Sequence, residues 1–116
     1  MIVDLRIYTC RPQKTAAFFQ IYRAHGWDVQ CRILGRCIGW YTTMEGPLNQ
    51  LVHLWAYRDM ADRQARRERL YADPEWLAYI ARSEEAGLLV SMENRLLKPT
   101  DFCPMPPGWD ETPDAI

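Results

Sequence analysis

The alternation of residues 49–57, NQLVHLWAY, most constrains the fold of this chain, because it requires a strand with two different faces. Successive side chains of a strand point to opposite sides. One side would carry Leu51, His53, Trp55 and Tyr57, and the other would carry Val52, Leu54 and Ala56. The first side places one titratable imidazole among aromatic rings. His53 therefore belongs to a catalytic pocket, to a ligand wall or to a polar contact at an interface.

Further strands follow from similar signals. Residues 1–9 alternate in the same way, and residues 88–97 predict a last strand that Pro99 closes. Residues 36–44 and 49–57 flank Glu45-Gly46-Pro47-Leu48, whose Gly and Pro predict a hairpin turn. These two strands should pair antiparallel.

Helix signals separate the strands. Pro12 suits the first position of a helix that Gly26 ends, and residues 27–34 predict a short continuation ended by Gly35. Asp59 predicts the N-cap of a helix beginning near Met60, with Asp62 as a weak capping box. Residues 73–75, Asp-Pro-Glu, start a new helix.

The order strand, helix, strand, strand, helix, strand predicts the α+β class with a ferredoxin-like antiparallel sheet. We assign residues 1–99 to this domain and the proline-rich residues 100–116 to an irregular C-terminal arm.

Several short motifs also resemble the NIPSNAP family over about residues 2–104. They are LGR at 34–36, Gly39, GPLNQ at 46–50, HLWAY at 53–57, DR at 62–63, RR at 66–67, DPEW at 73–76 and ENRLL at 93–97. The resemblance implies a dimeric α+β barrel, in which two subunits pack their sheets face to face and the helices lie outside. It implies no defined biochemical activity. The mitochondrial and membrane-traffic roles of eukaryotic relatives are not carried over to this chain.

Within that fold, the apolar strand faces are expected under the helices. They consist of Val3, Leu5, Ile7, Val52, Leu54, Ala56, Leu88, Val90, Met92 and Leu96. The opposite faces, which a face-to-face dimer would enclose, consist of Asp4, Arg6, Tyr8, His53, Trp55, Tyr57, Glu93 and Arg95. Buried charges must pair, so His53 is expected to hydrogen-bond at a homodimer interface to a nearby acid, preferably Glu93 or Asp4, or to a backbone carbonyl.

The candidate site follows from this face, and no residue in it is assigned a catalytic role. Candidates for ligand binding or for the polar network are Arg6, Tyr8, Asn49, His53, Trp55, Arg63, Glu93 and Arg95. For His53 a structural hydrogen bond is favoured over ligand binding or proton transfer, and metal or haem ligation comes last.

The basic stretch DRQARRERL, residues 62–70, is interpreted as a solvated helix face laced with ion pairs. The expected pairs are Asp59 with Arg63 and Asp62 with Arg66. The alternative is anion capture at the mouth of a cleft by Arg63, Arg66 or Arg67.

Composition excludes several classes. A net charge of −1 on 116 residues provides no field for nucleic acid. The scattered cysteines, Cys10, Cys31, Cys37 and Cys103, fit neither a zinc site nor a disulfide framework. With no signal peptide and no span of ~20 apolar residues, we expect a cytoplasmic chain without membrane insertion. No cofactor motif is present, so no metal, flavin or haem is expected.

Three function classes follow. The first is a homodimer that binds a small organic ligand in a cleft between sheet and helices, or a cofactor-independent enzyme built on that cleft. The second is a non-enzymatic interaction module, and the third is a haem-handling protein. A polar pocket would favour the first class, and a filled interior with an exposed apolar patch the second.

Overall fold

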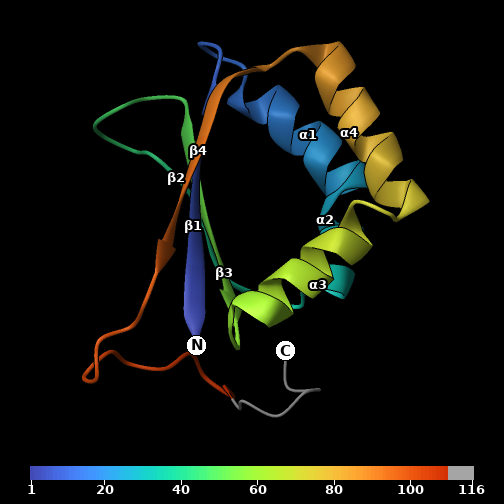
Figure 1. Cartoon of the computed structure of the whole chain (residues 1–116). Helices are drawn as coiled ribbons and strands as arrows, with labels where there is room; N and C mark the ends of the chain where they lie inside the picture. Colours follow the sequence, from blue (N-terminus) through green and yellow to red (C-terminus); the bar gives the residue numbers. More distant parts are fainter. Residues whose placement is uncertain (110–116) are drawn as a thin grey trace.

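A computed structural model describes residues 1–109, in which a four-stranded antiparallel sheet carries all of its helices on one face (Figure 1). The elements are β1 (Ile2–Cys10), α1 (Thr15–His25), α2 (Trp27–Leu34), β2 (Arg36–Thr42), β3 (Gln50–Tyr57), α3 (Met60–Leu70), α4 (Pro74–Ala86) and β4 (Leu89–Leu97). The predicted ferredoxin-like α+β fold is confirmed, with each predicted helix formed as two consecutive pieces.

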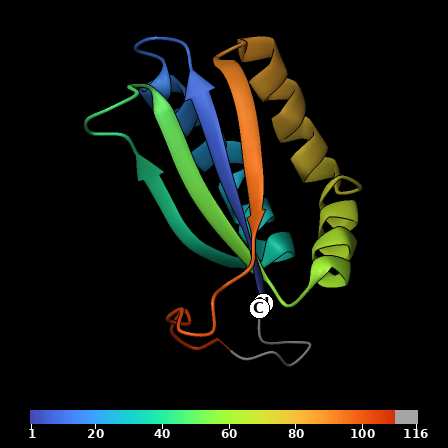
Figure 2. The same cartoon turned by 60° about the vertical axis from the view of Figure 1, so that its left-hand side comes forward.

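The sheet order is β2-β3-β1-β4, so β1 lies between β3 and β4 (Figure 2). β1 pairs antiparallel with both neighbours, and β2 and β3 form the predicted hairpin. The β2–β3 register shifts between Cys37 and Gly39. β4 is an edge strand of the sheet. Its helix-facing side borders the space between the sheet and the helices.

The predicted helix caps are formed. Asp59 accepts the backbone N–H of Asp62 at 2.8 Å at the start of α3. Asp73 accepts the N–H groups of Glu75 and Trp76 at 2.9 and 3.3 Å at the start of α4. Asp62 accepts the backbone N–H of Arg58 at 3.0 Å, one residue earlier than a capping box requires.

Two predicted element ends are wrong. α1 starts at Thr15, because Gln13 adopts a φ of 67° that breaks the helical path after Pro12. β2 ends at Thr42 instead of Met44, because the hairpin turn is wider than the four residues expected. Its closing hydrogen bond runs from Thr43 N–H to Gln50 O at 3.2 Å.

The assignment of the sheet faces is reversed on β1 and β3. On β4 it is confirmed for Met92 and Leu96, which lie opposite Tyr8 and Asp4 on the face under the helices. Trp55, Tyr57, His53 and Asp4 are at most 1% exposed within the single chain, under the helices. The hydrophobic core consists of Cys10, Phe18, Tyr22, Val29, Ile33, Leu34, Leu51, Trp55, Tyr57, Leu70, Trp76 and Tyr79. The helices cover the aromatic face because its rings bury more surface than the aliphatic side chains of the other face.

The strand register corrects the grouping on β4 as well. Residues that face each other across antiparallel strands share one face of the sheet. Glu93 lies opposite Ile7 and Arg95 opposite Leu5, so both belong to the outer face, away from the helices. Asn94, opposite Arg6, takes the inner position.

The predicted arm is described as far as residue 109, and its remainder lies outside the described residues. Residues 98–109 contain turns and no helix or strand, and the Arg36 guanidinium donates to the carbonyl of Pro107 at 2.5 Å. Among the helices of residues 1–109, none has the length and apolar character to cross a bilayer.

Candidate functional site

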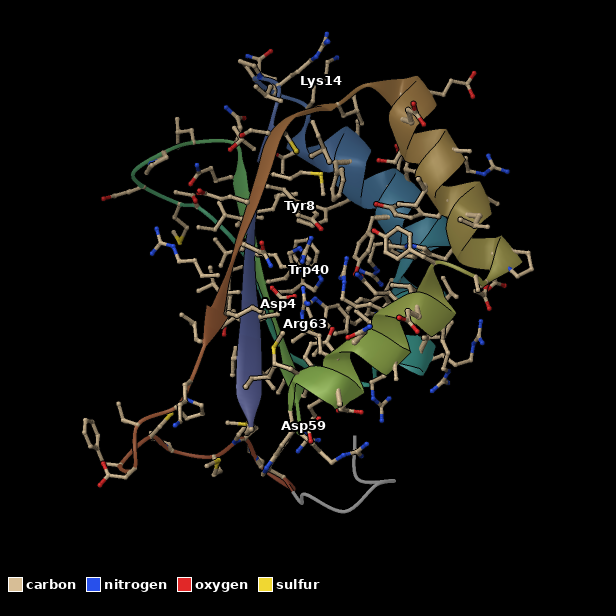
Figure 3. The ribbon with its side chains drawn as sticks, viewed as in Figure 1. Asp4, Tyr8, Lys14, Trp40, Asp59 and Arg63 are labelled. Carbon is tan, nitrogen blue, oxygen red and sulfur yellow. The ribbon has the colours of Figure 1, made fainter. Side chains whose placement is uncertain are left out.

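A buried carboxylate organises the inner face of the sheet at the end that α3 covers. Asp4 accepts hydrogen bonds from Arg6 at 3.1 Å, from Arg63 at 3.2 Å and from Asn94 at 3.1 Å. Figure 3 shows Asp4 and Arg63 facing each other between β1 and α3. Two guanidinium groups and one amide thus compensate a carboxylate that has lost its water.

Arg6 extends this network along β1, because its Nε donates to the hydroxyl of Tyr8 at 3.2 Å. The Tyr8 ring meets the imidazole of His53 edge-on, with centroids 4.7 Å apart. The charged end of the inner face is therefore continuous with the aromatic surroundings of His53.

His53 is enclosed by rings. The indole of Trp40 stacks on the imidazole, with centroids 4.2 Å apart and planes 5° from parallel. Trp55 donates its Nε1–H to His53 Nδ1 at 2.7 Å, while Nε2 is buried without a hydrogen-bond partner among residues 1–109. Burial and the nearby charge of Arg6 lower the pKa of His53 to about 3, although Asp4 opposes the shift.

These facts determine the protonation of His53. A pKa of about 3 leaves the imidazole neutral at physiological pH. A neutral imidazole carries its proton on one nitrogen, and Nδ1 is occupied as an acceptor for Trp55. The proton must therefore reside on Nε2, which makes this nitrogen a buried donor without an acceptor in the described part of the chain.

A cavity of about 430 Å³ lies beside His53, between the sheet and helices α1, α2 and α4. Its walls are largely aromatic, with polar atoms at a few points. They are formed by Tyr8, Tyr22, Gln30, Trp40, His53, Tyr71, Trp76, Tyr79, Ile80, Ser83, Glu84, Gly87, Leu89 and Met92. Trp76 also leaves its buried Nε1–H without a partner among residues 1–109.

The back wall of this cavity is held by hydrogen bonds among side chains. Trp40 donates to the hydroxyl of Tyr22 at 3.2 Å, and Tyr22 donates to Gln30. Burial raises the pKa of the Tyr22 hydroxyl, so the group stays protonated. On the far side of Tyr22 and Trp40 lies a second hollow of about 630 Å³, which Phe19, Arg23 and Trp27 also line. It does not include His53.

The structure brings together five of the eight predicted candidates: Arg6, Tyr8, His53, Trp55 and Arg63. Glu93 and Arg95 lie on the outer face and cannot join them. Asn49 lies in the hairpin at a φ of 67°, where it accepts the backbone N–H of Gln13 at 3.2 Å. The expected His53 bond to Glu93 or Asp4 is wrong, because Trp55 is its partner.

The ion pairs of α3 were predicted in part. Arg66 donates to Asp62 at 2.9 Å, as expected, and Arg58 pairs with the same carboxylate at 2.9 Å. Arg63 reaches across to Asp4 in place of the expected Asp59. A long side chain on the inward face of a helix can pair with the sheet beneath it, which spacing within the helix does not reveal.

The candidate set missed Trp40, Tyr22, Tyr79 and Asn94. Trp40 was detectable in principle, because it lies opposite His53 in the predicted hairpin. Tyr22 and Tyr79 come from different helices, and no spacing rule places them at one cavity. Asn94 is the polar residue that interrupts the apolar set of the last strand, and its position opposite Arg6 explains it.

The cysteines offer no activated nucleophile at this site. Cys10, Cys31, Cys37 and Cys103 are all free thiols. Burial, with a smaller effect from Cys37, raises the pKa of Cys31 to about 12, so its thiolate is scarce at neutral pH. Across residues 1–109 no three His, Cys, Asp or Glu side chains gather so that they could hold a metal ion. The expectation of no metal, flavin or haem stays a prediction.

Comparison with known proteins identifies the fold and the family. The ferredoxin-like arrangement recurs in a putative antibiotic biosynthesis monooxygenase from Nitrosomonas europaea, at a TM-score of 0.61 and 16% identity. The alignment covers 85% of this chain and 98% of that one, and a likeness at this identity concerns the fold alone.

Much higher identity is found to NIPSNAP structures. An uncharacterized NIPSNAP-like domain protein from Burkholderia xenovorans is 46% identical, with a TM-score of 0.83, over 91% of this chain and 90% of that chain. A NIPSNAP family protein from Agrobacterium tumefaciens is 42% identical, with a TM-score of 0.84, over 90% and 97% of the two chains.

The sequence comparisons agree. A NipSnap homolog from Dictyostelium discoideum is 30% identical over 96 residues, which cover 83% of this chain and 41% of that protein. The chain spans less than half the length of the curated relatives it matches. The family model named NIPSNAP matches residues 3–104. The chain therefore belongs to the NIPSNAP family.

Proposed function

We propose that this chain binds a small cyclic organic molecule, carrying an oxygen acceptor, in the cavity beside His53. One observation carries the proposal: at the wall of an aromatic cavity, His53 Nε2–H is a buried donor to which the residues that the structure describes offer no acceptor. A buried polar group without a partner costs about 1–3 kcal/mol, and a ligand oxygen would recover that loss.

The size of the cavity and its aromatic walls indicate the size and shape of the ligand. A volume of about 430 Å³ lies in the range of small-molecule sites. Rings from Tyr8, Trp40, Trp76 and Tyr79 supply flat apolar surface, which suits a planar ring more than a hydrated polar molecule.

The protonation of His53 favours binding over proton transfer. A general base works best with a pKa near the operating pH, and burial lowers the pKa of His53 to about 3. The neutral imidazole instead offers Nε2–H to an oxygen. If the protein is a cofactor-independent enzyme, His53 donates its Nε2–H to the ligand oxygen and thereby polarises the bond to that oxygen.

The test uses two probes that differ by one oxygen, 1-tetralone and tetralin. We expect 1-tetralone to bind roughly tenfold more tightly, as one hydrogen bond to a buried donor would give. His53→Phe keeps a ring under Trp40 and should abolish this preference. His53→Gln, which keeps an acceptor for Trp55 and a donor, should retain part of it.

Binding is measured by tryptophan fluorescence and checked by calorimetry. His25→Phe makes the same replacement at an exposed histidine outside the cavity and should leave the preference unchanged. Equal affinities of the parent protein for the two probes, or no binding of either, would contradict the proposal.

We further propose a homodimer, formed through the outer face of the sheet. No helix of the described chain covers that face (Figure 1). It carries apolar side chains that water still reaches, including Tyr41 at 57% and Leu97 at 40% exposure. A second copy would bury Leu5, Ile7, Val52 and Leu54, whereas Arg6 and His53, expected earlier at this interface, already lie beneath the helices.

A further inference from the structure

An arginine-bearing hollow on α3 adjoins the His53 cavity at Tyr71. This hollow, of about 390 Å³, is lined by Met60, Arg63, Gln64, Arg67, Glu68 and Tyr71. Tyr71 also lines the His53 cavity, so one ring separates the two spaces. Its ring meets Trp76 edge-on at 6.1 Å, and the Arg67 guanidinium lies 5.4 Å from its centroid.

Positive charge is in excess among the side chains that line this hollow and the network of Asp4 beside it. Three guanidinium groups, those of Arg6, Arg63 and Arg67, lie here, and the buried carboxylate of Asp4 pairs with Arg6 and Arg63 only. Glu68 is the remaining acid on this rim, and its Oε1 accepts from Gln64 at 3.1 Å. Counting three positive and two negative groups leaves one net positive charge.

Arg67 is the cation available to a ligand. Among residues 1–109 it has no carboxylate within ion-pair distance, and its guanidinium lies over the face of Tyr71. An arginine stacked on an aromatic ring keeps its N–H groups free at the edge of the guanidinium, where a carboxylate can bind with two hydrogen bonds.

The buried side chain of Tyr57 also supports a site for a negatively charged ligand group at this end of the molecule. Its hydroxyl is fully buried at this end of β3 and has no hydrogen-bond partner within residues 1–109. Burial and Asp4 raise its pKa to about 12, while Arg67 and Arg63 lower it, so the group is a protonated donor within the field of these arginines. The His53 cavity thus offers a neutral hydrogen-bond donor, and the adjoining hollow on α3 offers positive charge.

We infer that the ligand of the His53 cavity is a cyclic carboxylate, whose ring lies against Trp40 and Trp76 and whose carboxylate reaches past Tyr71 to Arg67. This inference rests on the proposed function and adds the chemical class of the ligand. Arg63, held by Asp4, is a positioning residue that maintains the positive rim.

The test compares 4-(1-naphthyl)butyrate with its amide, which has the same ring and chain without the charge. We expect the carboxylate to bind roughly fivefold more tightly, in line with a partly exposed ion pair. Arg67→Gln should remove this advantage, and Arg67→Lys should retain most of it. The advantage should also shrink as sodium chloride is raised.

Arg69→Gln is the matched control, because Arg69 is exposed on the same helix and does not line the hollow. Binding of 1-tetralone should be unchanged in Arg67→Gln. If 1-tetralone binds while the carboxylate and the amide bind equally, or not at all, the carboxylate site is wrong and the proposed function stands. If none of the three probes binds, the proposed function itself fails.

Discussion

The indole Nε1 of Trp55 donates a 2.7 Å hydrogen bond to Nδ1 of His53, two positions earlier on the same face of β3. This contact between near neighbours determines which nitrogen of the imidazole carries the proton. A contact within one strand therefore determines that Nε2–H of His53 is the hydrogen-bond donor at the cavity.

Removing the Trp55 donor should change the tautomer of His53. In the parent protein we expect the Nε2–H form at neutral pH, because Nδ1 is occupied as an acceptor. Trp55→Phe frees Nδ1 and should give a mixture of tautomers. Nitrogen-15 NMR of the histidine side chains measures this directly, with the signals of His25 as an internal reference. A parent spectrum dominated by the Nδ1–H form would contradict the prediction.

The lowered pKa of His53 should appear in the pH dependence of stability. Its pKa falls from 6.5 to about 3 on folding, so between these values the unfolded chain binds more protons than the folded chain. This group therefore has no effect above pH 6.5 and weakens stability as the pH falls from there towards 3. The limiting slope is about 1.4 kcal/mol per pH unit.

Urea unfolding across this window should show a shallower pH dependence in His53→Gln than in the parent protein. His25→Gln, which removes the exposed histidine, should keep the steep dependence of the parent. Parallel curves for the parent and His53→Gln would show that His53 titrates normally in the folded chain.

Truncation of His53 should lower stability without changing assembly. His53→Ala leaves the Trp55 N–H unpaired, for a loss of about 1–3 kcal/mol, and opens space beneath Trp40. The outer face of the sheet is untouched, so the dimer constant of the folded variant should equal that of the parent. Sedimentation equilibrium together with thermal melting separates the two effects, and a weakened dimer would place His53 at the interface after all.

Neutralising Asp4 should strongly lower the free energy of unfolding. Asp4→Asn leaves Arg6 and Arg63 facing each other without their shared carboxylate, and breaking such a buried network costs roughly 3–5 kcal/mol. Asp101→Asn, on the exposed surface, should change the free energy of unfolding by less than about 0.5 kcal/mol. A mild effect of Asp4→Asn in urea unfolding would mean that water already solvates this carboxylate.

A charge on the outer face should dissociate the proposed dimer. Val52 lies on that face in the centre of the sheet, so Val52→Glu would bury a carboxylate without a partner between two copies. We expect a folded monomer by sedimentation. Leu77→Glu, at an exposed site on α4, should remain dimeric. A parent protein that sediments as a monomer at micromolar concentration would rule out the dimer.

The sequence by itself determined the elements and their order. Alternation located each strand, and Asp59 and Asp73 marked helix starts that the structure confirms by hydrogen bonds to backbone N–H groups. These signals are local, because capping and pleating depend on residues within a few positions of one another. The NIPSNAP motifs likewise identified the family before any contact was known.

Only the tertiary structure decided which face of the sheet meets the helices. Alternation divides Val52 and Leu54 from His53 and Trp55, yet it cannot say which set lies inside. The simple rule that aliphatic faces are buried failed, because Asp4, Arg6, Arg63 and Asn94 satisfy one another and so allow a polar face to be buried. Their partners lie up to 90 positions apart, on strands whose register no local pattern determines.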